Sequence, residues 1–96
     1  MRVRASEQVV DFVRRLAPEP RRRVRDALRD LARGNGDIRP LEAPLDGYYR
    51  LRTGNFRILF TYATPKRIDC VFAERRALVY EVFSAAVAER LRGKSK

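Results

Sequence analysis

The chain has 96 residues, enough for one domain with a single core, and its 45% hydrophobic content argues against global disorder. The 22 Lys and Arg residues outnumber 12 Asp and Glu, and this net charge of +10 attracts nucleic acid or an acidic partner. No apolar run approaches the ~20 residues that span a bilayer, and no signal peptide is recognisable, so we expect no membrane association. The single Cys70 fits a reducing compartment, which predicts a cytoplasmic protein.

The first 34 residues predict a short strand followed by two helices. Residues 1–5 alternate weakly, as an edge strand would, and Ser6 suits the N-cap of a helix that runs to about residue 16. Prolines end that helix and begin a second one near residue 20, since proline is tolerated in a first turn. The second helix is expected to end near residue 33, with Gly34 as its C-terminal cap.

The rest of the chain predicts a β-meander and a final helix. Residues 35–47 are expected to form a connecting loop, followed by a hairpin over 48–62 and a further strand over 68–73. From residue 78 the apolar spacing is helical, although 79–83 is also compatible with a strand. We therefore predict a single α+β domain over residues 1–92, in which helices back a twisted antiparallel sheet. Residues 93–96 are expected to be a disordered tail.

The hairpin concentrates arginines on one face of the sheet. Gly54 and Asn55 suit a two-residue type II′ turn, which places Arg52 opposite Arg57. Arg50 then shares their face, which is expected to stay uncovered while the helices cover the other. Two cations directly opposite each other destabilise a sheet, so this arrangement indicates a polyanionic ligand. Two alternatives remain: a three-residue loop would shift the register by one, and an Arg-rich composition could scatter arginines onto any solvated strand.

Most familiar active-site chemistries are excluded. The chain has no His and no Gly-rich phosphate loop, and its carboxylates are scattered, so neither a metal nor another cofactor is expected. Guanidinium groups can bind a phosphodiester and stabilise the additional negative charge of its transition state. RNA supplies its own nucleophile in the 2′-hydroxyl, so a metal-free ribonuclease is feasible. Tyr80, close to Arg75 and Arg76, is a candidate for proton transfer, or else an aromatic residue at the start of a helix.

Two stretches resemble the RelE/ParE toxin superfamily of type II toxin–antitoxin systems. They are LDGYYRLRTGNFRILFTY (residues 45–62) and VFAERRALVYEVF (residues 71–83). The resemblance implies a RelE-like α+β fold. In RelE-like members it further implies an endoribonuclease that enters the ribosomal A site, cleaves mRNA and is held inactive by a small, acidic, DNA-binding antitoxin.

The resemblance also implies roles for individual residues. Arg57 matches the arginine that stabilises the transition state, and Tyr80 matches a stacking or proton-transfer tyrosine. Arg76 matches a later catalytic arginine, with Arg75 as a substrate-binding neighbour, although the two could exchange roles. Arg50 and Arg52 match substrate-binding positions that are lysines in the best-known members, so the group at these positions keeps its charge but cannot act as a base.

Two other functions are compatible with the same resemblance. A ParE-like toxin would bind and inhibit DNA gyrase without chemistry of its own, and the sheet arginines would then be dispensable for toxicity. An inactive copy of the fold would serve only as a binding protein. The arginine and tyrosine set favours the ribonuclease, because gyrase inhibition gives no reason for it.

Overall fold

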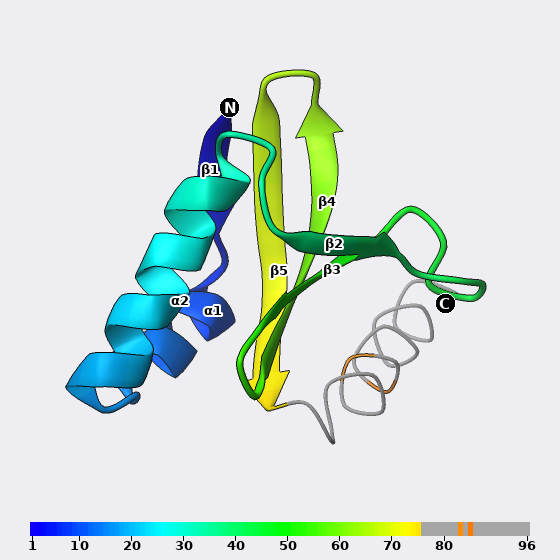
Figure 1. Ribbon diagram of the computed structural model, residues 1–96. Helices are drawn as coiled ribbons and strands as arrows, with labels where there is room; N and C mark the ends of the chain where they lie inside the picture. The colour runs from blue at the N-terminus through cyan, green and yellow to red at the C-terminus, as the bar shows by residue number, and fades with distance from the viewer. Residues whose placement is uncertain (76–82, 84, 86–96) are drawn as a thin grey trace.

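The computed structural model describes residues 1–75, Phe83 and Ala85, and forms a sheet with two helices beside it (Figure 1). The predicted order of a strand, two helices and a meander is confirmed. The elements are β1 (Arg2–Ala5), α1 (Glu7–Arg14), α2 (Pro18–Leu31), β2 (Asp37–Pro40), β3 (Tyr49–Thr53), β4 (Phe56–Thr64) and β5 (Arg67–Arg75).

The sheet has the strand order β1-β5-β4-β3-β2, with β1 parallel to β5 and every other neighbouring pair antiparallel. Both helices pack on one face, where their apolar sides bury a core against the strands (Figure 1). The predicted α+β class is therefore confirmed. The buried residues of this core are Val9, Val13, Leu16, Val24, Leu31, Leu51, Ile58, Phe60, Ile68, Cys70 and Ala73.

The expected connecting loop contains a strand, so that part of the prediction was wrong. Residues 37–40 form β2, which pairs with β3 and places Ile38 against the core. Proline is usually depleted in strands, but an edge strand can hold Pro40 because one side of its backbone has no partner. Gly36 leads into β2 with φ +138°, and a Cβ at this position would lie 2.7 Å from Leu51 Cδ1. Only glycine therefore fits where the chain enters the sheet.

The predicted C-terminal helix falls mainly outside the described residues. Phe83 and Ala85 are helical, in agreement with the helical spacing of this stretch. The rest of the predicted helix and the expected tail at 93–96 lie outside the residues that the structure describes.

Two polar side chains attach the start of α1 to β5. Ser6 Oγ accepts a hydrogen bond from Val9 N (3.3 Å), as an N-cap should, and donates one to Val71 O (3.1 Å). Gln8 Nε2 donates to Ala73 O (2.7 Å), and Gln8 Oε1 accepts from Ala73 N (2.8 Å). Ala73 lies beyond the part of β5 that pairs with β1, so its N–H and C=O have no strand partner on this side. The Gln8 amide bonds both groups in place of a strand.

Replacing Gln8 by leucine should lower the free energy of unfolding by about 1–3 kcal/mol, because it leaves the buried backbone groups of Ala73 without partners. Urea denaturation of the variant and the wild type measures this difference. Arg22→Ala, at an exposed position on α2, serves as the control and should change stability by less than about 0.5 kcal/mol. Equal effects of the two substitutions would contradict a structural role for the amide.

Cys70 lies in the core on β5 as a free thiol. Burial, with a smaller contribution from the negative charge of Asp69, raises the pKa of the thiol from 9.0 to about 12. Because folding raises this pKa, the protonated thiol favours the folded state. This contribution to stability is fully present below pH 9 and is lost as the pH rises towards 12.

We expect Cys70 to resist thiol reagents at pH 8 in the native protein and to react fully in urea, because the thiolate is the reactive form. Stability should also decline more steeply above pH 9 in the wild type than in Cys70→Ala, since only the wild type loses the thiol contribution. Ellman titration and denaturation at several pH values measure the two effects. Rapid native labelling at pH 8 would contradict the burial of the thiol.

Candidate functional site

The hairpin has the predicted register. Gly54 has φ +58°, and no described residue other than glycine has a positive φ, so Asn55 has a negative one and the turn is type II′. Arg52 pairs with Arg57 across β3 and β4, and Arg50 pairs with Leu59. The alternative three-residue loop is therefore excluded. Arg50, Arg52 and Arg57 project from the face that does not carry the helices.

The neighbouring strands add charges to this face that the sequence analysis missed. Arg39 of β2 lies opposite Arg50, and Asp37 lies opposite Arg52. On the other side, Glu74 of β5 lies opposite Arg57. Around the hairpin, on β2, β3, β4 and the end of β5, this face, which we call the arginine face, thus holds four guanidinium groups and two carboxylates. The alternation of residues 37–40 is a signal that could have revealed Arg39.

The arginine face was expected to be uncovered, and this was wrong for the part around Leu59 and Arg57. Leu59 lies on it fully buried, in a second apolar cluster with Leu45 and Phe83. The ring of Phe83 is 5.0 Å from that of Tyr48 and 5.7 Å from that of Phe72. Strand alternation places apolar residues on both sides of β4 and β5, so this sheet has a second face that needs cover.

Arg57 is the most enclosed of the four arginines, with only 4% of its surface exposed. Its Nη1 donates to Phe56 O (3.1 Å) and, at the limit of hydrogen-bond length, to Gly54 O (3.5 Å). The turn thereby fixes the direction of the side chain. A guanidinium in such an enclosed position interacts more strongly with an anion than one surrounded by water.

The other three arginines differ in their partners. Arg50 has a side chain that is only 13% exposed, and its Nη2 bonds Asp37 Oδ1 at 3.0 Å. The Arg50 Nε is buried, with no hydrogen-bond partner among the residues that the structure describes. Arg39 and Arg52 are exposed, and neither forms an ion pair within the part of the chain that the structure describes.

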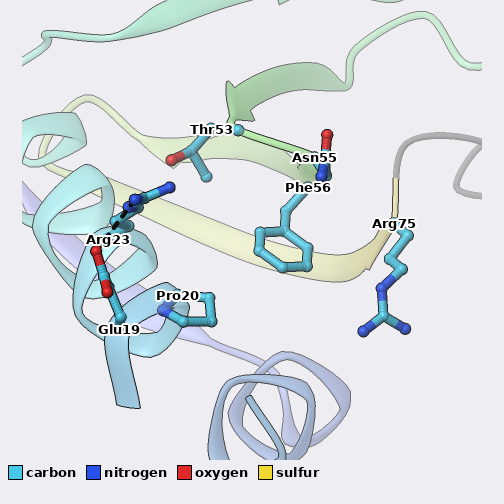
Figure 2. A pocket seen from close by; sticks show the side chains of 8 residues that line it. Glu19, Pro20, Arg23, Thr53, Asn55, Phe56 and Arg75 are labelled. Carbon is cyan, nitrogen blue, oxygen red and sulfur yellow. Dashed lines mark hydrogen bonds and ion pairs between the residues drawn. The ribbon is translucent and has the colours of Figure 1, made fainter. Parts of the chain in front are cut away.

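The structure places Arg75 on the helix-bearing face, away from Arg50, Arg52 and Arg57. It pairs with Phe56 at the end of β5. There it lines an open cavity of about 770 Å³, together with Glu19, Pro20 and Arg23 of α2 and residues 53–56 of the hairpin (Figure 2). Arg76 and Tyr80 lie outside the described residues, so their predicted roles remain predictions.

Within residues 1–75, Phe83 and Ala85, no three side chains of the kinds that hold metal ions lie together. In the same part of the chain, no helix combines the length and apolar character needed to cross a membrane.

The strand, two helices and mainly antiparallel sheet form a fold that this chain shares with solved structures of two toxin–antitoxin complexes and a toxin. A chain of the RelBE2 toxin–antitoxin complex of Mycobacterium tuberculosis is 24% identical, with a TM-score of 0.68 over 79% of this chain and 91% of that one. A chain of the RelB–RelE complex of Methanococcus jannaschii is 19% identical (TM-score 0.63; 80% and 94% covered). The YoeB/ParE toxin of Agrobacterium tumefaciens is 20% identical (TM-score 0.64; 78% and 98% covered). Neither protein-family models nor curated proteins gave a match.

Proposed function

We propose that the protein is the toxin of a type II toxin–antitoxin pair and acts as a ribosome-dependent mRNA endonuclease. The observation that carries the proposal is the pair of arginines directly opposite each other, Arg52 and Arg57, next to a second such pair, Arg39 and Arg50. Like charges in these positions destabilise a sheet, so a bound polyanion gives them a purpose. The fold shared with toxin structures adds support, although one fold can serve several functions.

In the proposed reaction the 2′-hydroxyl attacks the adjacent phosphorus and the 5′-oxygen of the next nucleotide leaves. Arg57 stabilises the charge that develops on the phosphoryl oxygens, helped by its enclosed position. Arg52 holds the phosphate, because its planar guanidinium group can form two parallel hydrogen bonds to phosphate oxygens. Because Arg57 is covered in the free protein, the side chains over it must move when RNA binds.

The remaining roles are part of the same proposal. Tyr80 would assist proton transfer and Arg76 would add positive charge, as the resemblance implies. Arg75 is separated from Arg57 by the sheet, so its contribution would be to bind a flanking part of the RNA. The chain's net charge of +10 suits both RNA and an acidic antitoxin bound over the basic surface.

Inhibition of DNA gyrase is a second candidate, and two observations favour it. Arg57 is almost completely buried, and Arg50 is already paired with Asp37, so two of the site residues that the sequence predicted are engaged within the protein. A toxin that acts by binding a protein would not need either group to reach a phosphodiester.

Mapping of mRNA ends on translating ribosomes after brief induction separates the two functions. The endonuclease predicts new mRNA ends in the codon at the A site within minutes, before any DNA damage. Gyrase inhibition predicts DNA damage first, with mRNA ends unchanged. The second result would refute the proposed function.

A further inference from the structure

The ion pair between Arg50 and Asp37 crosses the sheet diagonally. In the register of β2 and β3, the residue directly opposite Asp37 is Arg52, and Arg50 lies opposite Arg39. The carboxylate nevertheless bonds Arg50, with 3.0 Å between Nη2 and Oδ1. The direct neighbour of the acid is thus left exposed and without an ion pair among the described residues.

The two partners of this ion pair differ in how freely they can turn to a ligand. Arg50 is mostly buried, at 13% side-chain exposure, whereas Asp37 is 49% exposed. An arginine in this position can reach RNA less easily than its exposed neighbours Arg39, directly opposite on β2, and Arg52, two residues along β3. Without Arg50, Asp37 would have Arg52 as its closest cation, because directly opposite charges in a sheet attract each other.

We propose that Arg50 is a positioning residue: it neutralises Asp37 and so keeps Arg52 and Arg39 available for the phosphates of single-stranded RNA. The inference rests on the proposed function, since it concerns RNA at the same face. Arg39 and Arg52 are diagonal neighbours across β2 and β3, a relation in which Cα atoms are about 7–8 Å apart and long side chains can still meet. Together they form a two-arginine phosphate site at the edge of the sheet.

A double-mutant cycle tests this indirect role. The variants are Arg50→Met, Asp37→Asn and the combination, and the probe is a fluorescein-labelled single-stranded RNA with 2′-O-methyl riboses, which cannot be cleaved. Arg50→Met should weaken binding about 5- to 10-fold and reduce the slope of log K against log salt by about 0.7, the value for one phosphate contact on a single strand. Adding Asp37→Asn should restore both quantities. If Arg50 itself binds phosphate, the combination stays weak, and the inference is wrong.

A charge-matched control separates this mechanism from a general increase in positive charge. Glu7→Gln on α1 raises the net charge by one, as Asp37→Asn does, but lies on the helix-bearing side. In the Arg50→Met background it should not restore the salt slope. Equal rescue by Glu7→Gln would show that long-range charge alone is responsible and would overturn the inference.

Arg39 offers a test that does not depend on the stability of the Arg50 variant. It is exposed on an edge strand, so Arg39→Gln should not lower the melting temperature, but it should lower the salt slope by about 0.7. Unchanged RNA affinity in Arg39→Gln, or no binding by the wild type, would refute the inference. RNA binding with the expected cycle but without mRNA cleavage would leave it standing and would reject only the proposed endonuclease.

Discussion

Replacing Arg57 by alanine should lower mRNA cleavage by about 10²–10³-fold, the usual cost of removing one donor that stabilises transition-state charge. Arg57 is the site residue with the least solvent around it, and the turn carbonyls fix its direction. Cleavage rates in a reconstituted translation system, read from the 5′ ends of the mRNA fragments, measure the effect. The cleavage rate of Arg57→Lys should lie between those of the wild type and Arg57→Ala, because lysine keeps the charge but lacks the planar guanidinium group.

The burial of Arg57 makes a folding control necessary for this experiment. Circular dichroism and thermal melting establish whether Arg57→Ala retains the fold, and only a folded variant is compared. Arg22→Ala removes an exposed arginine on α2 and should cleave at the wild-type rate, which corrects for the change in net charge. A folded Arg57→Ala protein with undiminished cleavage would contradict the assignment.

Phe60→Ala should be the most destabilising substitution in the sheet, with a loss of about 3–5 kcal/mol in the free energy of unfolding. The side chain is fully buried in the central strand β4, and its ring lies 5.6 Å from Tyr49 and 5.4 Å from Tyr62. Truncation removes these contacts and leaves a cavity that the rigid strands cannot close.

Tyr62→Ala is the matched control, because Tyr62 belongs to the same aromatic group and is 41% exposed. It should lose less than half as much stability as Phe60→Ala. Urea denaturation of both variants measures the difference. Similar losses would show that burial does not decide the contribution of these rings.

The sequence predicted the hairpin well because a local signal determined it. The turn at Gly54 fixes the register, and the register fixes which arginines share a face. The edge strand β2 was missed because Pro40 is a general signal against strands, and only the tertiary position of that strand makes it acceptable. Arg39 and Asp37 were missed with it.

The cover over the arginine face could not be predicted from local patterns either. Strand alternation suggested one apolar and one basic face, but Leu59 and Phe72 are apolar and lie on the basic one. The position of Arg75 likewise depends on the pairing of β5 with β4, which puts it opposite Phe56. Both depend on contacts between segments that are distant in sequence, and periodicity carries no information about these.

The parallel pairing of β1 with β5 has a consequence for biosynthesis. The first strand finds its partner in the last strand of the sheet, and the Gln8 to Ala73 bonds beside it span 65 residues. During translation, residues 1–16 must therefore wait, without their main packing surface, until β5 has emerged from the exit tunnel. Such long-range closure slows folding. A nascent chain of this protein consequently completes the described sheet only after residue 75 has left the ribosome.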